Sequence, residues 1–487
     1  MKRLLWLAVP LTATVASTAL AGGYFSGEKG ARVAGRAGAV TAKADDIMAV
    51  QYNPAGLSDV GTTLIQVGNR FSYNAYSYTR KPTLDWGTLE NGVPPYVTFD
   101  DVENDTPWQL LDPLVGVATN FGLKDWGFAF AVYAPPGIAH ERYPEDGGQR
   151  YMMVEREAII LNYSLSAAWQ YRKTFGVGAS LQWIAVPKLR YSLVVDGHGM
   201  GNDDAYPVSS PYDLRATVDG KDLFTPNAIL GAWYKPAEFL EIGVSGQVIP
   251  ASIETASTLD LDPLSTGITE DVVLTRDGKE ANDVRLELPL PLTARLGVRY
   301  IHLQNGRELF DVELDVSYET WSRVESFKID SNGLVANLLG QRVDVGNIEV
   351  EKEWQDTITV QLGGDYAVVP NLVTARGGVF YESAVAPDAY ANVDFVGGEQ
   401  IGAALGGSVF VDRFEVAVAY GFRVQPTVSV TEKESRVYQE TPASLCDAPY
   451  TGDNCHPAYR GRPGPPANAG TYRAHSHVAS LDVLYRF

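Results

Sequence analysis

Two cysteines and six histidines are the side chains best suited to redox or metal chemistry in this 487-residue chain. Cys446 and Cys455 lie close together in a Pro/Gly-rich segment, where we expect one local disulfide in an oxidising compartment. The alternative is a metal site that includes His456, but the segment has no C-x-x-C spacing and no fourth ligand. His475 and His477 share one face of an alternating segment and have no obvious acidic partners. We therefore predict no metal site.

Catalytic motifs are absent from the sequence. It contains no Gly-x-Ser-x-Gly elbow, no phosphate-binding loop and no zinc-protease motif. We therefore predict that the protein is not an enzyme and uses no cofactor. The formal net charge of −20 argues against nucleic acid as a partner, because phosphate backbones are bound by an excess of Lys and Arg.

Lys188 and Arg190 are candidates for binding an anionic group. A pocket for an amphiphile with a carboxylate is mostly apolar and needs a cation at one end. Both residues lie on the polar face of an alternating segment, near one of its ends. The alternative is that they are ordinary charges of a lumen or loop. Which of these holds depends on the elements that position them.

Residues 1–21 resemble a secretory signal peptide. Lys2 and Arg3 precede an apolar run, and Ala19–Leu20–Ala21 forms an A-x-A cleavage site. An uncleaved membrane anchor is the alternative, but the apolar run is short and ends in small residues. We therefore predict export and cleavage after residue 21.

From about residue 62 the chain repeats one pattern, in which 10 to 20 residues of period-two alternation precede a turn. In the segment 175–195, Phe175, Leu189 and Tyr191 share one face, and Lys188 and Arg190 share the other. We expect the apolar face to point outward and the polar face to point into a lumen. We expect the same arrangement of an outward apolar face and an inward polar face for the segment 284–302.

Strand length and loop length together indicate a barrel in a membrane. Soluble strands usually have about 5–6 residues, whereas several runs here exceed 15. Short connections alternate with long polar insertions, which is typical of outer-membrane barrels. We therefore predict an all-β fold, a 14-stranded antiparallel transmembrane β-barrel. The expected strands are 62–80, 111–121, 126–139, 151–171, 174–195, 223–235, 238–257, 284–302, 309–330, 351–367, 371–382, 397–411, 414–431 and 473–487.

The segment "GRAGAVTAKADDIMAVQYNPAGL" is similar to the N-terminal signature of the long-chain fatty-acid transporter family, the FadL and toluene-uptake TodX type. The resemblance implies an N-terminal hatch, or plug, inside the barrel lumen. It is strongest in this block and weaker downstream, as in "YETWS" and "WQDT". The alternative is that this segment is a flexible leader. The expected division is a signal peptide at 1–21, a hatch at 22–61 and a barrel at 62–487, with a hatch motif formed by Asn53, Pro54, Ala55, Asp45 and Asp46.

The doublet Pro135–Pro136, followed by Gly137, interrupts the third expected strand. Proline donates no ladder hydrogen bond and is confined to strand edges and bulges. In the family this position forms a lateral opening in the wall, and the alternative is that the strand ends here at an external loop. Tyr24 and Phe25, at the start of the exported chain, are expected to contact substrate within the hatch.

These features predict an outer-membrane channel for passive uptake of hydrophobic compounds, such as long-chain fatty acids. The resemblance implies hatch movement followed by lateral release through the wall. The expected partners are the apolar substrate, outer-membrane lipid and the barrel-assembly machinery, which recognises a terminal aromatic such as Phe487. We expect a monomer in the bacterial outer membrane. A surface adhesin or receptor on a barrel scaffold is the alternative, and the loop at about 432–472 falls outside the family pattern.

Overall fold

The computed structural model describes residue 23 and the ranges 28–84, 96–135, 140–196, 213–264, 271–338, 341–395, 397–439 and 466–487. Several sequence predictions fall outside the described residues. They concern the signal peptide at 1–21, Tyr24 and Phe25, Pro136 and Gly137, and the Cys446–Cys455 disulfide. Within the described part, no helix has the length and apolar character needed to cross a membrane.

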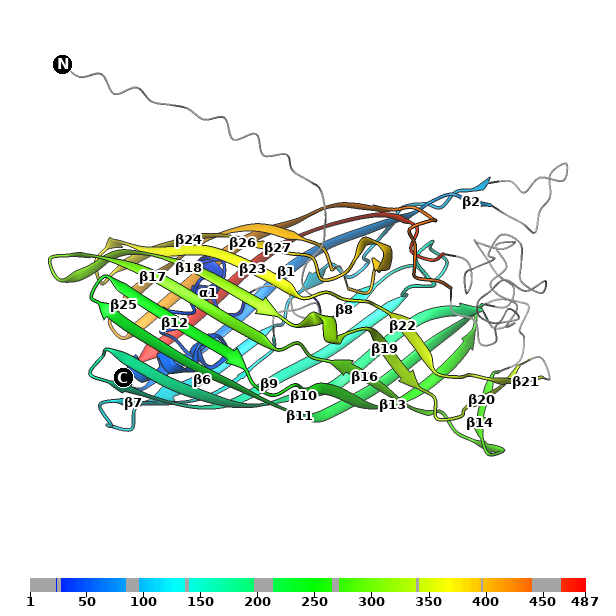
Figure 1. Cartoon of the computed structure of the whole chain (residues 1–487), viewed down its shortest axis with the longest axis horizontal. Helices are drawn as coiled ribbons and strands as arrows, with labels where there is room; N and C mark the ends of the chain where they lie inside the picture. Colours follow the sequence, from blue (N-terminus) through cyan, green and yellow to red (C-terminus); the bar gives the residue numbers. More distant parts are fainter. Residues whose placement is uncertain are drawn as a thin grey trace, which may run out of the picture.

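The strands form a closed antiparallel barrel, which confirms the predicted fold (Figure 1). Neighbouring strands pair in chain order, and the first strand pairs with the last from Leu64↔Arg486 to Arg80↔Gly470. Fourteen described strands form the closed ring. They are β1 (Leu64–Arg80), β6 (Pro113–Thr119), β7 (Trp126–Tyr133), β9 (Glu155–Tyr171), β10 (Phe175–Asp196), β11 (Asp213–Ala237), β12 (Leu240–Gln247), β17 (Thr293–Gln304), β18 (Arg307–Glu319), β23 (Thr357–Val369), β24 (Val373–Glu382), β25 (Gln400–Val411), β26 (Phe414–Val430) and β27 (Gly470–Arg486).

One end of the barrel has short turns, and the C-terminus lies there (Figure 1). The β17–β18 turn is an example, since Asn305 and Gly306 both have positive φ (53° and 72°), as a tight two-residue hairpin requires. The other end is extended by shorter strands. These are β4 (Val102–Glu103), β5 (Trp108–Gln109), β8 (His140–Arg142), β13 (Ser252–Pro263), β16 (Asp283–Pro289), β19 (Ser326–Asp330) and β22 (Ile348–Glu351). Two small sheets are separate from the barrel sheet. One contains β14 (Val273–Arg276), β15 (Lys279–Glu280), β20 (Val335–Leu338) and β21 (Gln341–Asp344), and the other pairs β2 (Thr83–Leu84) with β3 (Tyr96–Val97).

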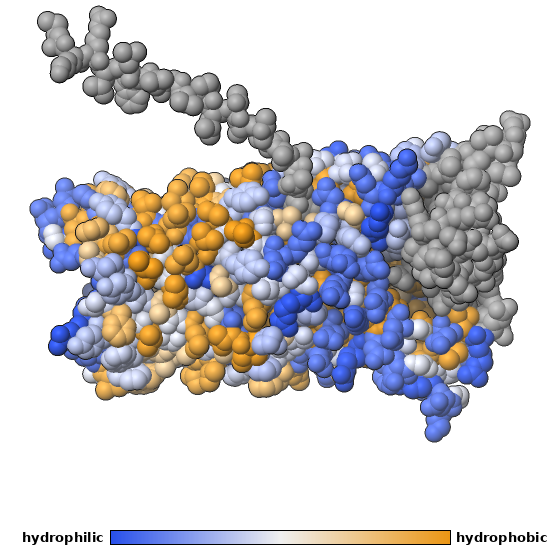
Figure 2. Space-filling view, viewed as in Figure 1, coloured by the Kyte–Doolittle hydropathy of each residue, from blue (hydrophilic) through white to orange (hydrophobic). Residues whose placement is uncertain are grey.

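The polarity of the outer surface divides the barrel into two sections. Apolar side chains cover much of the half with the short turns, whereas the opposite half is largely hydrophilic (Figure 2). We call these halves the lower and the upper section. A water-soluble protein rarely exposes so large an apolar area, and a transmembrane barrel carries such a band where it faces lipid. The lower section is therefore the membrane-embedded part.

The two sections meet at breaks in the strands, and many breaks contain proline. The β9–β10 register shifts between Ala185 and Lys188, where Pro187 lies. Pro250 separates β12 from β13, Pro291 separates β16 from β17, and Pro426 lies where the β26–β27 register shifts. Proline is tolerated at such positions because a bulge leaves one residue without a ladder hydrogen bond.

Some of these breaks reverse the two faces of the strands, although odd-numbered residues are buried on both sides of Pro250. On β10, Leu181 is 65% exposed below the break, and Leu189 is 7% exposed above it, although both have the same parity in the sequence. Across the β16–β17 break, Leu296 is exposed and Leu286 is buried. An inserted residue moves every later side chain to the opposite face. The prediction that one parity holds along the whole of 175–195 and 284–302 is therefore wrong above the breaks.

Candidate substrate pocket, hatch and wall break

The N-terminal segment fills the lumen of the lower section. It contains α1 (Ala31–Gly35), α2 (Ala49–Tyr52) and the 3-10 helix η1 (Pro54–Asp59), and α1 lies inside the barrel (Figure 1). The whole stretch 30–42 is buried. Wall glycines make room for it, since a side chain at Gly363 or Gly378 would collide with the carbonyl oxygen of Arg36. The N-terminal segment therefore packs closely against strands that carry glycine at the points of contact.

Asn53 joins two parts of this segment to the wall. Its side chain caps η1 by accepting a hydrogen bond from the amide of Ala55 (3.2 Å). Its Nδ2 donates to the carbonyl oxygens of Thr41 (2.8 Å) and of Ala232 on β11 (3.1 Å). Pro54 occupies the first turn of η1, where a missing amide hydrogen has no cost. The Asn-Pro-Ala sequence thus suits a helix start that is fixed to the wall.

Buried ion pairs anchor the same segment to β18 and β23. The Arg36 guanidinium contacts Asp311 (2.6 Å), Glu313 (2.9 Å) and Asp365 (2.7 Å). The Asp315 carboxylate accepts hydrogen bonds from the amides of residues 40 (2.9 Å) and 41 (2.8 Å). Asp311, Glu313 and Asp315 alternate along β18 and therefore share its buried face. Buried charges of both signs satisfy one another here and leave the lumen filled.

Asp45 and Asp46 have different partners. Asp45 forms an ion pair with Arg32 (2.7 Å) and is half-exposed. Asp46 is buried and accepts a hydrogen bond from the amide of Met48 (2.8 Å), just before α2. The two acids therefore stabilise the local conformation of the segment. Their hydrogen-bond and ion-pair partners among the described residues belong to the same segment.

Above this segment the upper section encloses an apolar pocket with about 740 Å³ of empty space. The reversed faces contribute to it, because Leu189, Leu286 and Leu288 were predicted to point outward and point inward above the breaks. Two rings, Phe327 and Phe395, meet edge to face at 5.6 Å and form an aromatic wall. The lining residues are Arg156, Ala158, Ile160, Val186, Leu189, Arg190, Tyr191, Ile253, Leu286, Leu288, Phe327, Ile329, Val350 and Phe395.

Arg156 brings a positive charge to the apolar pocket. Its guanidinium lies 4.1 Å from the centre of the Phe395 ring and donates a hydrogen bond to Glu141 (2.9 Å). Burial raises the pKa of the Glu141 carboxyl to about 7, although Arg156 opposes the rise and Asp394 adds to it. The sequence analysis did not identify Arg156. The available signal was the alternation along β9, where Arg156 shares the buried face with Ser164 and Ser166.

Lys188 and Arg190 lie on the outer face, and the prediction that they point into the lumen is wrong. Their side chains are 44% and 38% exposed. Lys188 pairs with Glu157 (2.7 Å), and Arg190 pairs with Asp219 (2.9 Å). This hydrogen bond raises the pKa of Arg190 above its usual value. The break at Pro187 turned both cations away from the pocket, and Arg190 reaches the pocket lining only as the neighbour of Leu189 and Tyr191 in the same strand.

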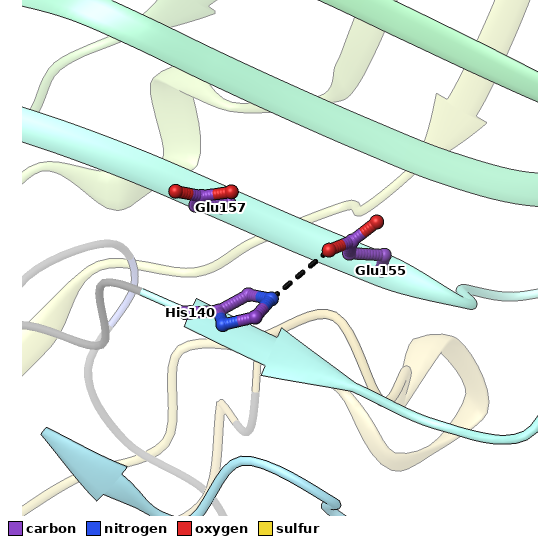
Figure 3. A group of neighbouring side chains, drawn as sticks. All are labelled: His140, Glu155 and Glu157. Carbon is purple, nitrogen blue, oxygen red and sulfur yellow. Dashed lines mark hydrogen bonds and ion pairs between the residues drawn. The ribbon is translucent and has the colours of Figure 1, made fainter.

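His140, Glu155 and Glu157 form the group of described side chains best placed to bind a metal ion (Figure 3). His140 Nε2 lies 3.0 Å from Glu155 Oε1. Lys188 already pairs with Glu157, and Arg190 lies 3.9 Å from Glu155. Since these cations balance the acids, the group gives no reason to abandon the prediction of no metal site.

Among the described residues, the pairing with β9 has a gap between β7 and β8. Tyr133 pairs with Asn162 of β9, and the next described pair is His140 with Glu157. Pro135 lies in this interval and lines a second cavity with about 1030 Å³ of empty space. The second cavity is polar and lies between the apolar pocket and the N-terminal segment. Its lining includes Gln51, Tyr52, Asn162, Ile184, Leu290, Arg295 and Glu382.

Comparison with known proteins agrees with this architecture. Residues 12–454 match the family model described as "Outer membrane protein transport protein (OMPP1/FadL/TodX)". No curated protein sequence matches the chain significantly.

Solved structures share the fold at low sequence identity. A FadL homologue from Pseudomonas aeruginosa is similar with a TM-score of 0.70 and 15% identity, covering 96% of this chain and 100% of that chain. The Pseudomonas putida toluene transporter TodX gives 0.62 and 15%, with 94% and 98% coverage. The monoaromatic hydrocarbon channel CymD gives 0.59 and 14%, with 94% and 97% coverage. The family model covers most of the sequence, and the chain therefore belongs to the FadL/TodX family of outer-membrane transport proteins.

Proposed function

We propose that this protein takes up hydrophobic small molecules passively across the outer membrane. The observation that carries the proposal is the apolar pocket in the upper section, which stands above a lumen filled by the N-terminal segment. An apolar molecule gains free energy by leaving water for this pocket, at about 0.8 kcal/mol for each buried methylene. No energy source is needed, because the molecule moves down its concentration gradient.

The N-terminal segment acts as the hatch in this proposal. Its ion pairs and wall contacts leave no wide aqueous channel along the described lumen. Passage therefore requires the hatch, residues 22–61, to move or to rearrange around the second cavity. The motif residues Asn53, Pro54 and Ala55 keep one end of the hatch attached to β11, and the acids Asp45 and Asp46 keep its local shape.

Release occurs sideways through the interrupted wall. Pro135 lines the second cavity and lies where β7 has no described pairing with β9. With Pro136 and Gly137, it prevents a continuous ladder, because proline lacks the donor that the ladder needs. A hydrophobic molecule in the second cavity would thus reach lipid without crossing the hatch into the periplasm.

The substrate class follows from the relatives and from the pocket. TodX and CymD are described as a toluene transporter and a monoaromatic hydrocarbon channel. The aromatic wall of Phe327 and Phe395 suits both aromatic rings and alkyl chains. Arg156 provides a cation for the carboxylate of a fatty acid. We propose both classes as substrates, and the family assignment favours transport over the adhesin alternative.

Five further features belong to the proposal. The signal peptide is cleaved after residue 21, and the barrel-assembly machinery recognises the strand that ends in Phe487. Cys446 and Cys455 form one disulfide in the external loop, and the barrel works as a monomer surrounded by outer-membrane lipid. Tyr24 and Phe25 contact substrate near the start of the hatch.

Uptake by whole cells tests the proposal. Cells with and without the protein would be supplied with radiolabelled palmitate in one arm and radiolabelled toluene in the other. We expect faster initial uptake of at least one probe in cells that make the protein. Equal uptake of both probes in both strains would reject the transport function.

A further inference from the structure

A groove floored by glycine lies on the lipid-facing surface, away from the proposed substrate path. It has about 1180 Å³ of empty space and crosses β18, β23, β24, β25 and β26 in the lower section. Gly364 of β23 pairs directly with Gly377 of β24, and Gly377 pairs with Leu405 of β25. The lining residues are Val312, Leu362, Gly363, Gly364, Gly377, Gly378, Val379, Ala403, Ala404, Leu405, Tyr420 and Phe422.

The walls of this groove are outward-facing apolar side chains. Val379 and Tyr420 are each 52% exposed, and Leu405 is 71% exposed. All twelve described lining residues are uncharged. The groove is therefore a hollow within the apolar band and differs from the mixed-charge lumen behind it.

Packing explains part of the glycine floor but not all of it. A side chain at Gly364 would collide with the backbone of Asp311 on β18, so this glycine is needed for close strand approach. A Cβ at Gly377 would lie 3.6 Å from the nearest atom of Leu405, which is an ordinary contact. The β23–β24 register runs without a shift from Thr359↔Glu382 to Ala367↔Thr374, so no bulge accounts for Gly377. Glycine in a regular strand often marks a place where another molecule approaches the backbone closely.

We propose that this groove binds one acyl chain of a membrane lipid. The occupant follows from its position, since the groove opens onto the lipid-facing band of an outer-membrane protein. Its lining is hydrocarbon and backbone apart from the Tyr420 hydroxyl, which is hydrogen-bonded to His477. An acyl chain is narrow enough to lie on a floor that carries no side chains. Such a chain contacts both the walls and the floor, and is held more firmly than lipid on a convex part of the barrel.

The inner face of the same strands adds a second feature. Gly363 and Gly378 pair across β23 and β24 and contact the hatch backbone at Arg36. The bound acyl chain and the hatch therefore lie on opposite faces of β23 and β24, at a point where both faces carry glycine. The inference rests on the family assignment and the groove, and it does not depend on the transport proposal.

Filling the groove provides the test. In Gly377→Leu the new side chain occupies the floor at a site where a Cβ fits without a clash. Ala294→Leu is the matched control, because Ala294 is an exposed, outward residue of β17 outside the groove. Each displaced methylene of the lipid costs about fourfold in affinity, so loss of two methylenes lowers retention by at least about tenfold.

Native mass spectrometry of protein extracted in mild detergent measures the retained lipid. We expect one lipid on the wild type and on Ala294→Leu, and at least about tenfold less on Gly377→Leu. Heat-modified gel mobility would verify that all three barrels are folded. A wild type without retained lipid, or equal retention by Gly377→Leu, overturns the proposal. A dimer that Gly377→Leu dissociates also overturns it, since the groove would then bind a second copy.

Discussion

Replacing Arg36 by methionine tests how the hatch is held. Arg36 contacts Asp311, Glu313 and Asp365 and is 1% exposed. Breaking a buried ion pair from one side typically costs 3–5 kcal/mol, because the other charge stays buried. Lys43 still contacts Asp311 (2.7 Å), so we take the lower end, about 3 kcal/mol. This corresponds to about a 100-fold increase in the open population of the hatch.

Hydrogen–deuterium exchange measures that population directly. Amides of residues 36–44 should exchange about 100-fold faster in Arg36→Met if they exchange through hatch opening. The control is Arg285→Met, since the Arg285–Glu254 pair is exposed and such pairs contribute only about 0–1 kcal/mol. Exchange in Arg36→Met that matches Arg285→Met would show that these ion pairs do not hold the hatch.

Three further predictions concern the hatch, the pocket and the wall. Asn53→Ala removes the η1 cap and its bonds to Thr41 and Ala232, and should lower the free energy of hatch opening by at least about 1 kcal/mol, measured by exchange of residues 54–59. Because the folded pKa of Glu141 is raised to about 7, the folded state binds an extra proton between about pH 4.5 and 7, and stability falls as pH rises through that window. Glu141→Gln should remove this part of the pH dependence in thermal unfolding. As pH falls from about 8 to 6, Arg156 loses its anionic partner and we expect a gain in palmitate affinity, which Glu141→Gln should flatten. Identical pH profiles of the wild type and Glu141→Gln would contradict this. Replacing Pro135 and Pro136 by valine should extend the β7 ladder and reduce uptake without unfolding the barrel, and unchanged uptake would reject release through the wall.

Sequence alternation was sufficient for the barrel but not for the direction of every side chain. The strand number followed from long runs with period two, because lipid and lumen impose opposite polarity on the two faces. A single extra residue at Pro187 reversed the pattern, and both Leu189 and Lys188 were assigned to the wrong face. Polar and apolar residues alternate in the same way on either side of a bulge. The face that a given residue occupies can therefore be predicted only if the position of the bulge is known.

Proline was the available signal for these reversals. The sequence analysis gave weight to Pro135–Pro136 alone, as a possible opening. The structure places Pro187, Pro250 and Pro426 at breaks in other strands too, where the wall remains paired on both sides of the break. Proline therefore marks the level of the breaks. The buried parity changes at Pro187 and Pro426, whereas odd-numbered residues are buried on both sides of Pro250. Pro135 differs from these prolines because the last described pair between β7 and β9, Tyr133↔Asn162, precedes it.

The pocket could not be predicted from the sequence for the same reason. Its lining combines residues from β9, β10, β13, β16, β19 and β22 that are far apart in the chain. Leu189, Leu286 and Leu288 lie on the strand face predicted to point outward, and Arg156 lies between two acids, Glu155 and Glu157. The prediction of a hatch rested on local signals, since small residues, mixed charge and the Asn-Pro-Ala sequence lie together in one segment.

Uptake through the pocket is the central claim, and a pocket-filling variant tests it most directly. Ile253→Trp adds an indole to the pocket lining, whereas Val298→Trp adds the same group to the outer face of β17. With both variants folded and present at equal amounts, initial uptake of palmitate and toluene should fall by at least about fivefold in Ile253→Trp, because an overfilled pocket costs about 1–3 kcal/mol. Uptake should be unchanged in Val298→Trp. Equal, undiminished uptake in the two variants would contradict the account.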